Sequence, residues 1–355
     1  MPKLTVDGLE VQVEEGATIL AAAKQAGVHI PTLCFLEGCS AAASCRVCVV
    51  EVEGQSNLVA SCNTPAREGM VVTTGSERVI AARRTALQLI LTRHDLDSTH
   101  YCFSCHKNGA CELQALCREL GVVDTPFNVP REKQPVLDSN PFLRYDPNLC
   151  IACQRCVGAC NNMAHAHALH AGKRGVRTTI EVPFGDDWRT SLCESCGNCA
   201  DACPTGALVE KRRQNYSEFD VEQVRTTCPH CAVGCQIDLV VKDNKIVDAH
   251  GADGPTNHGM LCVKGRSASY DFVDCDSRIR TPLIKNRETG EFEPVGWDEA
   301  LDLVASKFGA IKAEHGGDAL AAFACSRSTN EDIYMLQKMA RCAFDTNNVD
   351  NCARV

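Results

Sequence analysis

The chain opens with apolar residues that alternate with polar ones, a period of two that is typical of β-strands. Two short strands are therefore predicted on either side of a turn at Asp7-Gly8, followed by a helix over Thr18–Gly27. Further strands are predicted at Val47–Val52 and Leu58–Ala60. The alternating apolar positions of the first pair are Leu4, Val6, Leu9, Val11 and Val13.

Three longer stretches carry apolar residues every three or four positions, which predicts helices with one apolar face. The first follows Ser76, a residue type that favours the N-cap, and the second ends at Gly316-Gly317. The third begins at Ser326, after a buried strand predicted at Leu320–Ala324. The three stripes are Val79, Ile80, Ala86, Leu87, Ile90 and Leu91; then Trp297, Ala300, Leu301, Val304, Phe308 and Ile311; then Ile333, Leu336 and Met339.

Composition narrows the class of protein. The 355 residues suffice for two or more domains, and 25 of them are cysteines, far more than an ordinary enzyme contains. Met1 leads directly into the strand pattern, and no apolar run is long enough for a membrane span, so we expect neither a signal peptide nor a membrane protein. Such a cysteine content indicates metal binding in the cytoplasm rather than a disulfide scaffold. The net charge of −9 and the 5% aromatic content argue against nucleic acid as a partner.

Two cysteine runs in the middle of the chain have the C-x2-C-x2-C-x3-C spacing of a two-cluster bacterial ferredoxin. In that motif the fourth cysteine of each run ligates the other run's cluster, because the helix after the loop carries it away. The segment Lys173–Val182 between the runs is predicted to be a hairpin. Paired zinc knuckles are the alternative, but the doubled spacing favours electron transfer. We assign one [4Fe–4S] cluster to Cys150, Cys153, Cys156 and Cys203, and its neighbour to Cys193, Cys196, Cys199 and Cys160.

Four cysteines near the N-terminus form another group. Small residues crowd the loop between the first two, so that backbone N–H groups can approach the sulfurs of a cluster. The stretch resembles the [2Fe–2S] domain of complex I large subunits and of multi-cluster hydrogenases, which implies a β-grasp ferredoxin domain. Cys39 is left over, and a ligand set that starts with Cys34 and Cys39 stays possible. The expected ligands are Cys34, Cys45, Cys48 and Cys62.

The next group is Cys102, Cys105 and Cys111, followed by Glu-Leu-Gln. It resembles the [4Fe–4S] module, held by one histidine and three cysteines, that adjoins the [2Fe–2S] domain in the same families. There the histidine lies four residues before the first cysteine, where this chain has Ser98. His94 is favoured by its Arg-His-Asp context and His100 by its proximity, so both stay open. His106 is a weaker third candidate, because its neighbour Cys105 already occupies the site.

A fifth group comprises Cys228, Cys231, Cys235 and Cys262, and its uneven spacing fits zinc poorly. A hairpin is predicted within it, around Asp243-Asn244. The pattern resembles the N-terminal cluster of molybdenum and tungsten oxidoreductases that bind two pyranopterin guanine dinucleotides. That resemblance implies that Lys264 lies between the cluster and the pterin and hydrogen-bonds the pterin. The remaining sequence resembles the formate dehydrogenase branch.

The chain is therefore predicted to be a multidomain α+β protein. Five prolines and weak periodicity before the first ferredoxin run indicate a wrapping linker. The predicted parts are a β-grasp [2Fe–2S] ferredoxin domain (1–78), a one-histidine/three-cysteine [4Fe–4S] module (79–122), a linker (123–140), a two-cluster bacterial ferredoxin module (141–215), the cluster domain of a molybdopterin oxidoreductase (222–278) and the first α/β segment of its pterin-binding domain (279–355).

The resemblance implies the electron-relay portion of a formate dehydrogenase or CO2 reductase. One [2Fe–2S] and four [4Fe–4S] clusters would connect molybdenum or tungsten, held by a bis-pyranopterin guanine dinucleotide, to redox partner subunits of the NAD(P)/flavin, ferredoxin or hydrogenase type. The sequence has no glycine-rich dinucleotide or P-loop motif, so the final acceptor is expected on a partner. The alternatives are an [FeFe]-hydrogenase, a complex I large subunit and a non-redox zinc scaffold.

No residue of the chain is assigned a catalytic role. In the formate dehydrogenases that it resembles, a metal-ligating selenocysteine or cysteine follows the sequence Asn-Asn-Val-Asp-x-Cys-Ala-Arg-Val, which here ends at Val355. The metal ligand is therefore expected just after Val355, with a selenocysteine codon as the sharper explanation. We expect the 355 residues alone to be catalytically incomplete.

Overall fold

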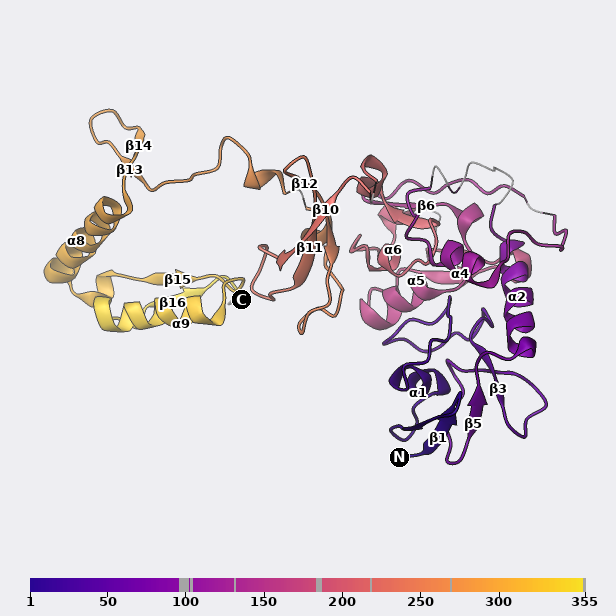
Figure 1. Cartoon of the computed structure of the whole chain (residues 1–355). Coiled ribbons are helices and arrows are strands. Elements are labelled where there is room, and N and C mark those ends of the chain that lie inside the picture. Colours follow the sequence, from indigo (N-terminus) through magenta and orange to yellow (C-terminus); the bar gives the residue numbers. More distant parts are fainter. Residues whose placement is uncertain are drawn as a thin grey trace. The chain divides into compact units, whose positions relative to one another are not determined.

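The structure, a computed structural model, describes residues 1–95, 102, 105–130, 132–182, 187–217, 219–268 and 270–353. The chain divides into two units, Met1–Val221 and Glu222–Val355. In Figure 1 the first runs from indigo to rose and the second from orange to yellow. Each unit is described by itself.

The first unit begins with a mixed five-stranded sheet in the order β2-β1-β5-β3-β4. β1 pairs antiparallel with β2 and parallel with β5, whereas β3 is antiparallel to both β4 and β5. The strands are β1 (Lys3–Val6), β2 (Leu9–Gln12), β3 (Val49–Val52), β4 (Val59–Ala60) and β5 (Val71–Thr73). The predicted β-grasp domain is thereby confirmed.

Helix α1 (Ile19–Gln25) covers this sheet and closes its core. The Thr18 hydroxyl caps the helix by accepting a hydrogen bond from the Ala21 N–H at 3.2 Å. The alternating residues predicted for the strands point inward and pack on the helix: Leu4, Val6, Val11 and Val13 with Ile19, Ala22 and Ala23. Leu9 is the exception, because it lies at the turn and is half exposed.

Two helices follow, α2 (Glu77–Leu91) and α4 (Glu112–Leu120). Ser76 caps α2 as predicted, since its hydroxyl accepts a hydrogen bond from the Val79 N–H at 3.2 Å. α4 ends at Gly121, whose positive φ of 64° suits the left-handed cap position. Leu87 and Leu91 of α2 pack with Leu113, Leu116 and Leu120 of α4 in one apolar core.

The ferredoxin part is framed by the antiparallel pair β6 (Leu143–Tyr145) and β9 (Leu208–Glu210), and each cysteine run leads into a short helix, α5 (Arg155–Gly158) or α6 (Asn198–Asp201). α5 continues into a π-helical turn over Ala159–Met163. The hairpin between the runs is formed by β7 (His170–Gly172) and β8 (Thr179–Glu181). The observed hairpin begins before the predicted Lys173. The residues from Lys173 onward form the turn, and the first strand precedes them.

The second unit starts with an antiparallel sheet, β10-β11-β12. The predicted hairpin is confirmed: Asp243 and Asn244 both have positive φ, as a type I′ turn requires. The remaining strands form the antiparallel pair β13/β14 and the parallel pair β15/β16. The elements are β10 (Glu222–Thr227), β11 (Gln236–Lys242), β12 (Lys245–Gly251), α7 (Val263–Ser267), β13 (Leu283–Lys285), β14 (Phe292–Pro294), α8 (Trp297–His315), β15 (Ala322–Ala324), α9 (Asn330–Met339) and β16 (Val349–Asn351).

Two predictions for this unit need correction. The strand expected at Leu320–Ala324 is only partly buried, because Phe323 is 79% exposed. The last helix starts at Asn330 rather than Ser326, because the Thr329 hydroxyl accepts the capping hydrogen bond from the Asp332 N–H at 3.2 Å.

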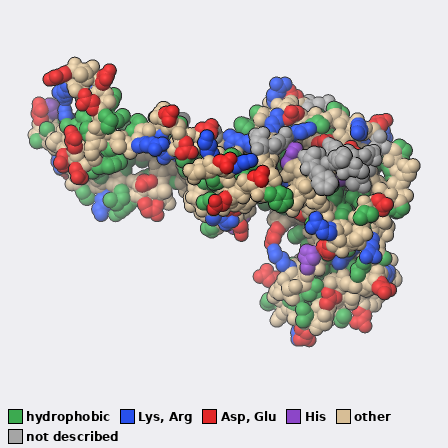
Figure 2. All heavy atoms as spheres, turned by 45° about the horizontal axis from the view of Figure 1, so that its top comes forward, with side chains coloured by type: hydrophobic (Ala, Val, Ile, Leu, Met, Phe, Trp, Pro, Cys, Tyr) green, Lys and Arg blue, Asp and Glu red, His purple; other side chains and the backbone are tan. Residues whose placement is uncertain are grey.

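The surface is mixed in charge and apolar character. On the face shown in Figure 2, Lys and Arg side chains are interspersed with Asp and Glu over both units. Green side chains also reach the surface, and the stripe predicted for α8 is largely exposed, with Trp297 68% and Leu301 57% accessible. Among the described residues, no helix combines the length and the apolar character needed to cross a membrane.

Replacement of Gly251 by alanine tests the packing of β12. A Cβ there would overlap the Gly259 carbonyl oxygen, a backbone atom that cannot move aside cheaply. We expect Gly251→Ala to destabilise the β11/β12 hairpin by about 1–3 kcal/mol. Hydrogen exchange of the hairpin amides, followed by mass spectrometry, measures the effect.

Gly309→Ala is the matched control, because no atom lies within 4 Å of a Cβ at this position in α8. An alanine within a helix should stabilise it by up to about 1 kcal/mol. Unchanged exchange of the hairpin in Gly251→Ala would contradict the packing described above.

Candidate functional site

The structure brings together Cys34, Cys45, Cys48 and Cys62, hereafter the Cys34 group. Cys34 and Cys45 lie in the loop between α1 and β3, Cys48 directly precedes β3, and Cys62 follows β4. Cys34, Cys48 and Cys62 are at most 4% exposed. Hydrogen bonding by Cys45 lowers the pKa of the Cys34 thiol to about 5, and hydrogen bonding by Cys62 lowers that of Cys48 to about 6. The same hydrogen bonds, together with burial, raise the pKa of Cys45 and of Cys62. Within each pair, Cys34 and Cys48 are therefore the thiols that more readily become thiolates, the form that binds iron.

Cys39 is not part of this group. Its Sγ would lie 3.2 Å from a Cβ placed on Gly158, so the thiol packs against the backbone of α5 in the ferredoxin part. Burial alone raises the pKa of Cys39, whereas Cys34 interacts with Cys45. The geometry therefore favours the ligand set with Cys45 over the alternative that starts with Cys34 and Cys39.

The second group joins a histidine to three cysteines. His94, Cys102, Cys105 and Cys111, hereafter the His94 group, line one small cavity. His94 Nδ1 lies 3.0 Å from the Leu149 carbonyl oxygen. Because a carbonyl oxygen accepts, Nδ1 carries the proton and Nε2 carries the lone pair that a metal needs. The sulfur of Cys111 accepts a hydrogen bond from the Gln114 N–H at 3.4 Å and caps α4.

The other two histidine candidates have different positions. His106 lies beside Arg144 in a separate cavity, and burial followed by the charge of Arg144 lowers its pKa. His100 lies outside the described residues. Among the described histidines, His94 is therefore the one that the structure places with the three cysteines.

The structure places Cys203 of the second ferredoxin run with the first run, and Cys160 of the first run with the second. Cys150, Cys153, Cys156 and Cys203, hereafter the Cys150 group, line one cavity and are each 8% exposed. Burial raises the pKa of Cys156 well above its usual range, and the neighbouring thiols raise it further. The Ala152 N–H donates to the Cys150 sulfur at 3.4 Å.

The reciprocal set is Cys193, Cys196, Cys199 and Cys160, hereafter the Cys193 group. Cys160, carried away from its own run by α5, interacts with Cys193 and Cys196 and shares a core with Cys199. Donors surround its sulfurs: the Ala168 N–H points at Cys160 at 3.3 Å and the Ser195 N–H at Cys193 at 3.4 Å. Such donors stabilise the negative charge of a cluster.

The fifth set, Cys228, Cys231, Cys235 and Cys262, hereafter the Cys228 group, lies in the second unit. Burial raises the pKa of Cys235, and the nearby thiols of Cys228, Cys231 and Cys262 raise it further. The Cys228 N–H donates to the Cys235 carbonyl oxygen at 2.8 Å, which closes the loop. Cys262 directly precedes α7, and Lys264 lies exposed on the first turn of that helix. Val355, beside the expected metal ligand, lies outside the described residues.

Three of the groups share one apolar core. Cys34 and Cys153 belong to the same buried cluster as Leu33 and Ile151, and Cys111 packs against it. The Cys111 sulfur also lies 3.6 Å from the Pro204 carbonyl oxygen, next to Cys203. The Cys34, His94 and Cys150 groups are therefore neighbours, and the contact of Cys156 with Cys199 continues to the Cys193 group.

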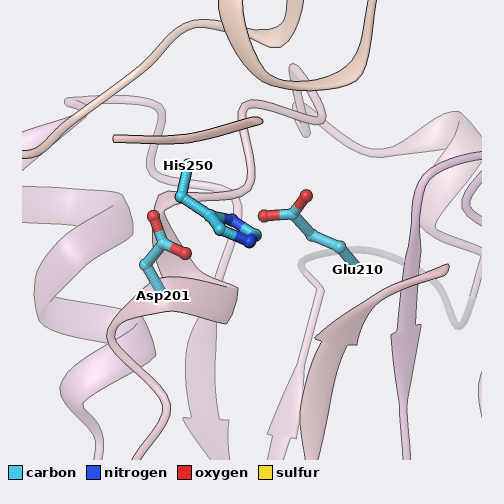
Figure 3. Close-up of side chains that lie close together, drawn as sticks. All are labelled: Asp201, Glu210 and His250. Carbon is cyan, nitrogen blue, oxygen red and sulfur yellow. The ribbon is translucent and has the colours of Figure 1, made fainter. Parts of the chain in front are cut away.

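Two carboxylates lie beside the ferredoxin part. Asp201 ends α6 and Glu210 ends β9, and an oxygen of each lies within 4.8 Å of the other (Figure 3). Negative charge near a cluster lowers its reduction potential. Figure 3 also labels His250, which belongs to β12 of the second unit, where its Nε2 lies 3.8 Å from Oδ2 of Asp248.

Sequence analysis missed two buried polar residues that face these groups. Arg83 is 6% exposed, donates to the Val49 carbonyl oxygen at 3.0 Å, and lies within electrostatic reach of Cys48. The sequence does contain a signal for Arg83. This arginine lies midway between Val79 and Leu87, at the spacing that places all three on the apolar face of the predicted helix. Tyr145 is 2% exposed and lines the cavity of the Cys150 group, and no sequence pattern distinguished it.

The residues present fit iron–sulfur clusters. Each set supplies four sulfur donors, or three and an imidazole, around a common centre. Backbone N–H groups donate to several of the sulfurs, as is usual around inorganic clusters.

Comparison with known families agrees with this arrangement. The chain matches the 2Fe-2S iron-sulfur cluster binding domain (2–77), the NADH-ubiquinone oxidoreductase-G iron-sulfur binding region (83–126), the NADH-quinone oxidoreductase subunit 3 ferredoxin-like domain (140–209), the molybdopterin oxidoreductase Fe4S4 domain (221–273) and molybdopterin oxidoreductase (278–355).

Several relatives align with nearly the whole of this chain. The NADPH-Fe(3+) oxidoreductase subunit alpha of Geobacter sulfurreducens is 35% identical over 356 residues, and an NADH-quinone oxidoreductase subunit of Rhizobium meliloti is 35% identical over 358 residues. A Staphylococcus haemolyticus protein provisionally named a formate dehydrogenase is 32% identical over 399 residues. These alignments cover 99–100% of this chain and 39–40% of each relative, so the chain spans about two fifths of their length.

A crystal structure of an NAD+-reducing [NiFe]-hydrogenase in the H2-reduced state also matches. The TM-score is 0.54 at 33% identity, over 59% of this chain and 87% of the hydrogenase chain. The likeness therefore extends from sequence to fold over 59% of this chain.

Substitution of the histidines tests the His94 group. We expect His94→Ala to change or abolish the electron paramagnetic resonance signal of one [4Fe–4S] cluster, because Nε2 is the fourth ligand in this geometry. His106→Ala should leave all signals unchanged, since its ring faces Arg144. A normal signal in His94→Ala would show that another residue completes the set.

Proposed function

Because the chain belongs to the oxidoreductase family in which complex I-type iron–sulfur domains precede a molybdopterin oxidoreductase domain, we propose that it is the electron-relay part of a formate dehydrogenase. The observation that carries the proposal is the convergence of twenty ligand side chains into five groups of four, of which three share a core. The Cys34 group would hold a [2Fe–2S] cluster, and the other four would each hold a [4Fe–4S] cluster.

The protein residues fix the positions of these clusters relative to one another and exclude water from some of their sulfurs. Clusters carry single electrons, and the protein sets their potentials through hydrogen bonds, charge and burial. Leu33, Ile151 and the leucines of α2 and α4 pack around Cys34 and Cys153 and keep water away from these two sulfurs. The route that we propose in the first unit runs between the Cys34, His94, Cys150 and Cys193 groups through their packed side chains.

The second unit would supply the connection to a metal–pterin cofactor. When bound, such a cofactor would oxidise formate to CO2, with release of two electrons and one proton. Lys264 follows Cys262 on α7, and the Cys228 sulfur would lie 3.4 Å from a Cβ on Gly265, so this helix approaches the sulfurs closely. In our proposal the Lys264 ammonium hydrogen-bonds the pterin beside the Cys228 group.

The substrate and the partners follow from the relatives and remain part of the proposal. Formate is supported by the resemblance of the last segment and by the 32% identical relative that bears the name of a formate dehydrogenase. Partner subunits that bind NAD(P), flavin or ferredoxin are supported by the relatives named as oxidoreductase subunits. We place the activity in the cytoplasm, where cluster thiols stay reduced.

A second candidate function is electron relay in a complex I-type enzyme without formate chemistry. It is favoured by the Rhizobium meliloti relative, named as an NADH-quinone oxidoreductase subunit, which is more similar than the formate dehydrogenase relative. The two candidates share the clusters and differ in whether formate delivers electrons to them.

Metal analysis and reduction by formate test the proposal. The complete protein, purified without oxygen together with its partners, should contain about 18 iron atoms per chain and little zinc. In a formate dehydrogenase, formate should reduce the clusters and bleach their visible absorbance. In a complex I-type enzyme purified with its partners, NADH should bleach this absorbance and formate should not. Zinc in place of iron would exclude both candidates.

Replacement of Lys264 tests the pterin connection. We expect Lys264→Ala to leave the iron content unchanged but to slow reduction of the Cys228-group cluster by formate at least tenfold, because the hydrogen bond between helix and pterin is lost. Rapid mixing with freeze-quench spectroscopy measures the rate. Lys285→Ala, on exposed β13, is the control for loss of one surface charge, and an equal rate in both variants would contradict the role of Lys264.

A further inference from the structure

Residues 203–206, hereafter the Cys203 segment, belong to the Cys150 group through Cys203 but also contact the His94 group. The Pro204 carbonyl oxygen accepts a hydrogen bond from the Glu112 N–H at 3.0 Å, at the start of α4. The same oxygen lies 3.6 Å from the Cys111 sulfur. A ligand of one group is therefore followed directly by a residue that touches a ligand of the other group.

Gly206 brings the same segment against a second ligand of the His94 group. A Cβ placed on Gly206 would lie 2.5 Å from the Cys105 sulfur, closer than atoms that are not bonded can approach. Glycine permits this approach because it has no side chain. The loop after Cys160, by contrast, turns back into the ferredoxin part, where Asn161 Nδ2 donates to the Leu169 carbonyl oxygen at 3.2 Å.

Thr205 connects the segment with the histidine ligand. Thr205 is 1% exposed, and its hydroxyl donates to the Leu149 carbonyl oxygen at 3.1 Å. The same oxygen lies 3.0 Å from His94 Nδ1, and Leu149 directly precedes Cys150 in the chain. One hydrogen bond and one peptide unit thus join His94 to Cys150.

The hydroxyl proton of Thr205 has a second acceptor within reach, the Cys203 sulfur at 3.7 Å. The Thr205 oxygen itself accepts a hydrogen bond from the Ala207 N–H at 3.3 Å, which fixes the rotamer of the side chain. The shorter distance assigns the proton to the Leu149 carbonyl. That carbonyl therefore receives two donors, Thr205 from one side of the contact and His94 from the other.

We propose that the Cys203 segment and Leu149 form the electron bridge between the clusters of the His94 and Cys150 groups, and that Thr205 is its positioning residue. Thr205 fixes the carbonyl that orients the His94 imidazole. Electron transfer becomes steeply slower with distance, and bonded and hydrogen-bonded atoms carry it better than an empty gap. One cluster loses the electron that the other gains, and Thr205 undergoes no redox change. The inference rests on the proposed function and on His94 as a cluster ligand.

Thr205→Val removes the hydroxyl and nearly keeps the shape of the side chain. In the complete, anaerobically purified protein, electron spin echo spectroscopy should show a changed nitrogen coupling between His94 and its reduced cluster, because the imidazole is no longer held. Flash reduction followed by freeze-quench electron paramagnetic resonance should show several-fold slower exchange of an electron between the two clusters. Their signals are identified by their loss in Cys111→Ala and in Cys153→Ala.

Thr205→Ser is the matched control, because it keeps the hydroxyl and should restore both the coupling and the rate of the wild type. An unchanged coupling or an unchanged rate in Thr205→Val, with normal iron content, would overturn the inference while the proposed function stands. A more negative potential of the Cys150-group cluster with an unchanged His94 coupling would show that the hydroxyl serves the Cys203 sulfur, which also overturns the inference. Zinc instead of iron in the wild-type protein would overturn the proposed function.

Thr205→Val also leaves the Ala207 N–H without its acceptor. If this variant loses a cluster, Gly206→Ala decides the question, because the added methyl group pushes the Cys203 segment away from the Cys105 sulfur. The spectrum of the His94-group cluster should change and electron exchange should slow, although residue 206 belongs to the ferredoxin part. Gly75→Ala, with no atom within 4 Å of its Cβ, should change neither. A wild-type spectrum and rate in Gly206→Ala would contradict the bridge.

Discussion

Burial of several thiols at one point is the constraint on which the first unit depends. Burial raises the pKa of Cys150, Cys153 and Cys156, and each neighbouring thiol raises it further. Four thiolates could not remain together in this apolar surrounding without a compensating positive charge. Iron supplies that charge in the proposed clusters, so cluster binding must displace protons and should stabilise the fold. The Cys34 group differs, because hydrogen bonds lower the pKa of two of its thiols.

The same burial explains why the cluster sites lie next to one another. A loop that holds four sulfurs has few apolar side chains of its own, and it must borrow a core from a neighbour. Leu33 and Cys34 of the first domain, Leu87 and Leu113 of the two helices, and Ile151 of the ferredoxin part meet in such a shared core. A short distance between redox centres is therefore a consequence of how these small domains are stabilised. Arg83 adds a buried cation beside this core, close to Cys48.

The second unit is built differently. Its sheet and the Cys228 group have a small core of their own around Ile237, Ala249 and Leu261. By contrast, no residue of α8 or α9 is fully buried. Ile311 and Leu336 pack on a small core around Leu320 and Phe344, but the start of the α8 stripe, from Trp297 to Val304, is exposed. An exposed stripe of this kind is typical of a surface that packs on another part of a protein.

The sequence by itself determined the features that depend on short spacing. The C-x2-C-x2-C-x3-C runs predicted the exchange between Cys160 and Cys203, because a tight loop holds three sulfurs together and the following helix removes the fourth. Ser76 as a cap and Asp243-Asn244 as a turn were predictable for the same reason, since each acts on a backbone only a few residues away.

Only the tertiary structure decided the features that depend on distant parts of the chain. His94 joins its cysteines because the Leu149 carbonyl, 55 residues further on, orients the imidazole. Cys39 lies apart from the Cys34 group because it packs on Gly158, and Tyr145 lines the cavity of the Cys150 group while β8 holds its hydroxyl. Contacts across such separations arise from the packing of whole elements, and the spacing of residues along the chain carries no record of that packing.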